Sequence, residues 1–202
     1  MLAHSQNLDI VTQSQAINGF LPMRDDLAKL SSGLYVAELV DRFTEEREAS
    51  YPLFRLLVEA LERIARGDQV SVALRYFEMG LLTISGYAPQ LRACVVCGGG
   101  LRPVVNAFSP SAGGAVCADC NPAQSALRRL SVNGIKVMRL MQQAPFADVA
   151  RIRLGHDLAV EIEDHLRAVL RVHAERDLRS LQFLHRVGRE SNASGNAAAV
   201  VS

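Results

Sequence analysis

The four cysteines of the chain form two Cys-x-x-Cys pairs, Cys94 with Cys97 and Cys117 with Cys120. Nineteen residues separate the pairs, a spacing typical of a four-cysteine zinc site. Each pair directs two thiolates at a single point about 2.3 Å away, and two pairs together complete a tetrahedron. We therefore predict that the four thiolates hold one structural zinc ion.

The residues that follow the two pairs support this prediction. Gly98 follows the first pair, where a positive φ lets backbone N–H groups point at the sulfurs, and glycine adopts a positive φ freely. Asn121 follows the second pair and tolerates the same conformation, although Pro122 restricts it. The segment has few large apolar residues, so we expect metal rather than a hydrophobic core to order it.

Two other kinds of chemistry use cysteines of this type. A thioredoxin-like redox site needs one Cys-x-x-Cys pair beside a βαβ unit, and two pairs in a glycine-rich segment fit that poorly. Catalytic zinc needs an open coordination position and a neighbouring acid or base. Four thiolates fill the tetrahedron, and Asp119 is the single acid between the first and last cysteine. Thiol titration with and without a chelator separates the redox site from the zinc site.

Helices are predicted on both sides of the cysteines, because apolar residues recur there at steps of three and four. The predicted helices are 27–43, 51–66, 69–84, 127–142, 146–152 and 157–176, with a final short turn carrying Leu181 and Leu184. The helix at 69–84 is apolar on nearly every side, so we expect it at the centre of the fold. Short strands are predicted at 8–17, 102–108 and 114–117.

The net charge is only +1, but residues 127–202 carry twelve Lys and Arg against eight Asp and Glu. Basic side chains on two of the predicted helices are candidate phosphate contacts. They are Arg128, Arg129, Lys136 and Arg139 on the helix after the cysteines, and Arg167, Arg171, Arg176 and Arg179 on the last long helix. Acidic residues interleave with the second set, so a solvated helical face is the favoured alternative.

The N-terminus lacks the basic start and apolar core of a signal peptide. No apolar run approaches the ~18 residues that a membrane span needs. We therefore expect a cytoplasmic protein without membrane contact. A reducing compartment disfavours structural disulfides, which leaves metal as the first explanation of the four cysteines.

Residues 74–99, LRYFEMGLLTISGYAPQLRACVVCGG, followed by FSPSAGGAVCADC at 108–120, resemble the bacterial RecO family of recombination and repair proteins. The stretch 8–46 resembles the passage in which that family leaves an oligonucleotide-binding (OB) barrel and enters a helical domain. The likeness covers roughly residues 5–190.

The fold that this resemblance implies is mainly α. We expect the remnant of an OB-fold β-barrel at 1–22, a helical domain at 23–190 with a zinc-ribbon-like insertion of four cysteine ligands at 88–122, and a disordered tail at 191–202. Family members carry a further stretch ahead of the position of Met1. We therefore expect either a start codon assigned too late or a fragment, and DNA binding would be weaker without the barrel.

The resemblance also implies a function without catalysis. RecO proteins bind and anneal single- and double-stranded DNA, pair with RecR, and contact the C-terminal tail of single-stranded DNA-binding protein (SSB), which promotes recombinase loading. We therefore expect a nucleoid-associated repair mediator with structural zinc that is not an enzyme. The alternative is a zinc-ribbon regulator, or a protein-interaction module, that binds through the cysteine segment itself. The stretch from Cys94 to Cys120 contains Arg102 as its one Arg and contains no Lys.

By the same resemblance Arg75 lines the pocket for the SSB tail, with Leu74 and Met79 as candidate walls. A guanidinium beside an apolar groove suits a ligand that combines a carboxylate with large apolar side chains. The residues alone favour plainer roles. Arg75 would form an i,i+3 ion pair with Glu78, and the two apolar residues would lie in the core.

Aromatic platforms on which single-stranded DNA could stack are scarce. Phe54 and Phe77 are expected in the core, and Phe108 is expected in an exposed loop. His165 and His173 border the apolar stripe of the last long helix and are expected to be ordinary packing residues. The sequence contains none of the common nucleophile or nucleotide-binding motifs.

Overall fold

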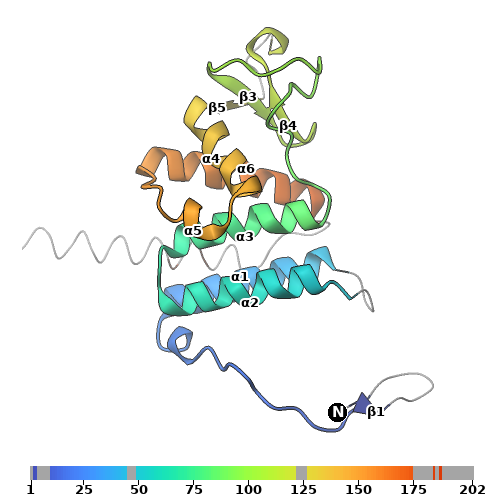
Figure 1. Ribbon diagram of the computed structural model, residues 1–202, viewed down its shortest axis with the longest axis vertical. Helices are drawn as coiled ribbons and strands as arrows, with labels where there is room; N and C mark the ends of the chain where they lie inside the picture. The colour runs from blue at the N-terminus through green and yellow to red at the C-terminus, as the bar shows by residue number, and fades with distance from the viewer. Residues whose placement is uncertain are drawn as a thin grey trace, which may run out of the picture.

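The computed structural model describes residues 2–3, 10–44, 49–121, 127–174, 184 and 187. Within these ranges the chain is mainly helical, as predicted, with a small sheet at one end of the helices (Figure 1). Outside them lie the predicted tail at 191–202, Pro122, Arg176, Arg179 and Leu181.

The first helices of the fold are α1, α2 and α3, and their bounds agree with the predicted ones. They span Leu27–Phe43, Tyr51–Arg66 and Val70–Ile84. Asp26 begins α1, because its Oδ1 accepts hydrogen bonds from the backbone N–H groups of Ala28 at 3.0 Å and Lys29 at 3.1 Å. Gly67 ends α2 with a φ of 82°, a conformation that glycine adopts without strain.

Helix α3 lies between two groups of helices, which confirms its predicted place at the centre. It contacts α1 and α2 on one side and the later helices on the other (Figure 1). These later helices are α4 (Val132–Gln143), α5 (Phe146–Val149) and α6 (His156–His173). Large apolar side chains of α3 are buried, among them Phe77, Met79 and Leu81. Each contributes roughly 1.5–3 kcal/mol through removal of its surface from water.

A three-stranded antiparallel sheet carries the cysteine segment. Its strands are β3 (Asn106–Ser109), β4 (Gly114–Val116) and β5 (Arg128–Leu130), in the order β4-β3-β5. The prediction of a helix from 127 onward is wrong at its start, since Arg128 and Arg129 lie in β5 and pair with β3. Helix α4 begins after Ser131, whose Oγ accepts from the N–H of Gly134 at 2.9 Å.

The two faces of this sheet belong to different cores. Phe108 and Leu130 are fully buried in the core of the helical domain. Ala107 and Val116 point the other way and pack with Cys94 and Cys117 in a second, small cluster. Alternation along a strand places neighbouring residues on opposite faces, so one short sheet serves both clusters.

This arrangement corrects three expectations. The cysteine segment is not coreless, because one face of its sheet packs on the helices. Phe108 lies in β3 with no exposed surface rather than in an exposed loop. Phe54, expected in the core, is 59% exposed on α2, because it lies outside the stripe that faces α1 and α3.

The N-terminal residues contribute little regular structure within the described ranges. Strands β1 (Leu2–Ala3) and β2 (Ile10–Val11) form a short antiparallel pair. Of the strand predicted at 8–17, the structure describes residues 10–17, and among these only Ile10 and Val11 lie in a strand. The 3₁₀ turn η1 (Leu21–Met23) then leads into α1. Among the described helices, none is both long and apolar enough to cross a bilayer.

Candidate metal centre and partner-binding arginine

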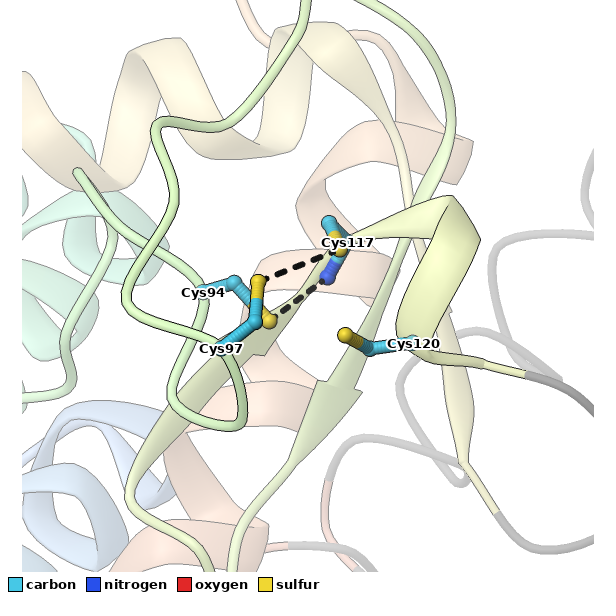
Figure 2. Close-up of side chains that lie close together, drawn as sticks. All are labelled: Cys94, Cys97, Cys117 and Cys120. Carbon is cyan, nitrogen blue, oxygen red and sulfur yellow. Dashed lines mark hydrogen bonds between the residues drawn. The ribbon is translucent and has the colours of Figure 1, made fainter.

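The four cysteine sulfurs converge on one point at the end of the small sheet. All four Sγ atoms lie within 4.8 Å of one another, and the Sγ atoms of Cys97 and Cys117 are 3.9 Å apart (Figure 2). A tetrahedral zinc site with Zn–S bonds of about 2.3 Å has S···S edges of roughly 3.8 Å. The four side chains therefore fit a metal ion of this kind.

Backbone hydrogen bonds shape the first cysteine turn. Gly98 has a φ of 74°, as predicted, and its N–H donates to the Cys94 carbonyl oxygen at 2.8 Å. The N–H groups of Val96 and Cys117 donate to Cys94 Sγ at 3.4 Å and 3.3 Å. The second pair differs. It forms a 3₁₀ turn, η2 (Ala118–Cys120), and Asn121 has a φ of −102° rather than a positive one.

These contacts shift the pKa values of Cys94 and Cys120 in opposite directions. Burial alone would raise the pKa of Cys94, but N–H groups from Cys117, Cys97 and Val96 stabilise its thiolate and lower the pKa to about 6. The pKa of Cys120 is raised to about 12, chiefly by hydrogen bonding with the sulfurs of Cys117 and Cys97. A metal ion that binds here displaces the remaining thiol protons, so its affinity rises with pH.

An ion pair on the surface joins the two halves of the cysteine segment. Arg102 Nη2 lies 2.7 Å from Asp119 Oδ1 and 2.8 Å from Asp119 Oδ2. Both side chains are mostly exposed, at 62% and 74%. The one arginine and the one acid between Cys94 and Cys120 are thus engaged with each other.

Helix α4 anchors the chain that enters the cysteine segment. The Arg139 guanidinium donates to the Leu91 carbonyl oxygen through Nε at 2.9 Å and Nη2 at 2.5 Å. Gln142 Nε2 donates to the Pro89 carbonyl oxygen at 2.8 Å. Arg139 is therefore half-buried and bound to backbone, an anchoring role that its place in the sequence did not indicate.

Helix α6 holds the other end of the segment. The Nε2 atom of His165 lies 3.0 Å from the Arg129 carbonyl oxygen, and its ring packs against Phe108. The Ser131 N–H donates to Glu161 Oε1 at 2.6 Å. His165 is buried, as expected of a packing residue. The contact of Glu161 was missed, because nothing in the sequence relates it to the start of α4, thirty residues earlier.

Arg75 lies inside the helical domain rather than on its surface. Its Nη2 donates to Glu78 Oε1 at 2.6 Å, and its Nη1 lies 2.6 Å from Glu163 Oε2 on α6. Arg75 is 3% exposed and Glu78 is fully buried, so the predicted ion pair is a core feature. Burial raises the pKa of Glu78, and Arg75 opposes that shift. Tyr35 of α1 donates to Glu78 Oε1 at 2.7 Å.

The other predicted site residues fall into two groups. Leu74 and Met79 are buried in the core around α3. The basic candidates lie on separate elements: Arg128 and Arg129 on β5, Lys136 and Arg139 on α4, Arg167 and Arg171 on α6. Arg128, Arg129, Lys136 and Arg171 are exposed, whereas Arg139 and Arg167 are partly buried. Contact of any of them with DNA stays a prediction.

Comparison with known proteins agrees with this architecture. Residues 24–182 match the family described as Recombination protein O C terminal. The chain belongs to the RecO family. A DNA repair protein RecO of Dehalococcoides mccartyi strain BAV1 is 36% identical over 183 residues, which are 91% of this chain and 72% of that protein. A DNA repair protein RecO of Roseiflexus sp. strain RS-1 is 38% identical over 197 residues, which are 98% of this chain and 70% of that protein.

Family membership places the cysteine segment and Arg75 within the RecO match. Both lie between residues 24 and 182, so neither is an addition outside the family's C-terminal region. Four clustered cysteines and a mainly helical domain are therefore features of this RecO chain.

Proposed function

We propose that this RecO chain acts in DNA repair as a recombination mediator without catalytic activity. In this role it binds single- and double-stranded DNA, RecR and the C-terminal tail of SSB, and it promotes strand annealing and recombinase loading. The observation that carries the proposal is the match of residues 24–182 to the RecO C-terminal family.

The proposed metal is one structural Zn²⁺ held by Cys94, Cys97, Cys117 and Cys120. Clustering of the four sulfurs within 4.8 Å supports it, because four thiolates satisfy zinc without leaving an open position. The ion would fix the two cysteine turns against the β3–β4 face of the sheet, with no part in chemistry.

The proposed partner site is centred on Arg75, with Leu74 and Met79 beside it. Its support is the guanidinium, which pairs with carboxylates in the structure and suits the acidic tail of SSB. For DNA, the exposed side chains of Arg128, Arg129 and Lys136 support phosphate contacts without sequence readout. These two assignments name the side chains that would contact the SSB tail and the DNA.

The direct test is annealing of complementary oligonucleotides coated with SSB. We expect the full chain to accelerate annealing, and we expect the effect to fall steeply with added salt, because phosphate contacts release counterions. Gel-shift assays with the same oligonucleotides measure binding separately. Failure of the chain to bind DNA, RecR or SSB in these assays would contradict the proposal.

The second candidate function is that of a zinc-ribbon regulator that binds nucleic acid through the cysteine segment. The exposed position of this segment at one end of the molecule favours it (Figure 1). The Arg102–Asp119 pair counts against it, because the one arginine between Cys94 and Cys120 is already paired with an acid. Binding of a target that survives substitution of Arg128 and Arg129 but not of Arg102 would support the regulator instead.

A further inference from the structure

The four cysteines differ in their exposure to solvent. Cys97 is exposed, Cys120 is half-buried, and Cys94 and Cys117 are only 2% and 8% exposed. The N–H groups of Val96 and Cys117 also donate to the Cys94 sulfur and hold it in place. Oxidation of a thiolate to a sulfenic acid requires contact between the sulfur and a dissolved oxidant. Cys97 therefore carries the sulfur that is most accessible to a peroxide.

A second sulfur lies near enough to Cys97 to form a disulfide with it. The Sγ atoms of Cys97 and Cys117 are 3.9 Å apart and come from different Cys-x-x-Cys pairs (Figure 2). A disulfide needs about 2.05 Å between its sulfurs, so the two side chains must rotate toward each other. Gly98, Gly99 and Gly100 follow Cys97, and glycine adjusts its backbone at little steric cost. A Cβ on Gly98 or Gly100 would meet nothing within 4 Å, so this turn has room to move.

We propose that Cys97 is an oxidative modification site, at which a peroxide converts the metal-binding cysteines into a form with a Cys97–Cys117 disulfide. In the first step the Cys97 thiolate attacks one oxygen of hydrogen peroxide, the O–O bond breaks, and hydroxide leaves. In the second step the Cys117 thiolate attacks the sulfur of the resulting sulfenic acid, the S–O bond breaks, and a second hydroxide leaves. Two thiolates thus lose two electrons, and the peroxide is reduced to two hydroxide ions.

The disulfide leaves only the thiolates of Cys94 and Cys120 for a metal. A disulfide sulfur does not replace the lost ligands, because the thiolate is the form of cysteine that binds metal. Two protein ligands do not satisfy a tetrahedral structural site, so zinc is released. This step rests on the proposed function, in which four thiolates hold one zinc ion.

The disulfide would join the same two parts of the cysteine segment that the ion joins. Cys97 ends the first Cys-x-x-Cys pair, and Cys117 directly follows β4. On the other face of the sheet, Phe108 and Leu130 stay packed in the core of the helical domain. The oxidised chain is therefore free of metal, closed by a covalent bond and still folded. A reductant together with zinc should reverse the change.

The test adds hydrogen peroxide to the full chain loaded with zinc at neutral pH. A chelating dye measures the zinc released, and alkylation followed by tandem mass spectrometry locates the remaining thiols and the cross-link. We expect two thiols to be lost for each zinc ion released, with the cross-link between Cys97 and Cys117. We also expect far-UV circular dichroism to stay unchanged, and we expect dithiothreitol with added zinc to restore the bound metal.

Two neighbouring glycines provide a matched pair of variants that keep all four cysteines. A Cβ on Gly99 would lie 3.4 Å from the Sγ atom of Cys97, whereas a Cβ on Gly100 would meet nothing within 4 Å. Gly99→Ala should therefore shield the sulfur and slow the release of zinc severalfold. Gly100→Ala should release zinc at the wild-type rate. Equal rates in the two variants would show that the peroxide attacks another sulfur first.

Dimedone, which traps sulfenic acids, identifies the first oxidised cysteine in the wild type without any variant. We expect the label on Cys97. A label on another cysteine, or a disulfide within either Cys-x-x-Cys pair, would overturn the proposal, as would retention of all thiols and of zinc in excess peroxide. If the wild type carries no zinc but still forms the Cys97–Cys117 disulfide, the proposed metal is wrong and the modification site stands.

Discussion

His165 of α6 donates from Nε2 to the backbone carbonyl oxygen of Arg129 in β5 at 3.0 Å. This bond satisfies a main-chain acceptor of the edge strand. The histidine ring also packs against Phe108, with ring centroids 4.6 Å apart. The sheet that carries the cysteines is thus held by side chains of α6 as well as by its own strands.

The first prediction concerns pH. Burial lowers the pKa of His165; Glu161 and the Arg129 carbonyl oxygen oppose that shift, Arg128 adds to it, and Asp164 opposes it. The folded state therefore favours the neutral ring, and unfolding takes up a proton at pH values between the folded pKa and the unfolded value of about 6.5. The stability that depends on the neutral ring is present above that unfolded value and is lost as the pH falls through the folded pKa.

We expect His165→Gln to flatten this dependence, because glutamine keeps an N–H donor but does not titrate. Urea unfolding at about pH 7.5 and about pH 5.5 measures the free energy of unfolding of both chains. Wild type should lose more stability than the variant between the two pH values. Equal losses would show that another group, such as a cysteine thiolate, dominates the acid sensitivity.

The second prediction concerns the glycine at the start of β4. A Cβ on Gly114 would lie 2.3 Å from the Gln90 carbonyl oxygen, where the Ala115 N–H donates at 2.8 Å. Gly114→Ala must therefore push the entering chain away from the sheet, at a cost of about 2 kcal/mol or more. Thermal unfolding provides the measurement. Gly100→Ala is the control, since a Cβ there meets nothing within 4 Å, and an equal loss in both variants would contradict the steric argument.

The third prediction concerns the metal. Cys117→Ser should reduce bound zinc from one ion per chain to almost none, as measured with a chelating dye. The far-UV circular dichroism of the helices should change little, because Phe108 and Leu130 remain packed on the helical core. Wild-type protein that purifies without zinc would contradict the expected metal content. A Cys117→Ser variant whose helices unfold would contradict the expected independence of the helical core.

The fourth prediction concerns the buried arginine. Arg75→Met leaves Glu78 in the core without its cation, and loss of one partner of a buried pair typically costs about 3–5 kcal/mol. The double variant Arg75→Met with Glu78→Met removes both charges and should recover part of that loss. Urea unfolding of the single and double variants gives the coupling energy. Additive losses would mean that the two side chains stabilise the fold independently.

Local patterns in the sequence predicted much of the fold and the cysteine site. The helices from 27 to 84 follow from apolar residues at steps of three and four, and their ends follow from Asp26 and Gly67. The metal site follows from the spacing of the four cysteines along the chain. In each case the informative residues are neighbours in the chain, so no knowledge of distant contacts is required.

The predictions that failed depended on distant contacts. Arg128 and Arg129, predicted in a helix, lie in a strand because they pair with β3, about twenty residues earlier. No local pattern in the sequence indicates that pairing. Phe108 is buried because α6 arrives beside it, and His165 covers it from that helix. Glu163 could not be linked to Arg75 for the same reason, since eighty-eight residues separate them.

The two-faced sheet determines how this protein can be trimmed. Excision of the whole segment 88–122 would remove Phe108 from the helical core and expose the apolar side chains that it covers. The shortened chain should therefore be prone to aggregation. Replacement of the four cysteines by apolar residues would leave intact the face of the sheet that carries Phe108 and Leu130. A metal-free variant should therefore keep the three strands and replace the cysteines with apolar side chains that pack against Ala107 and Val116.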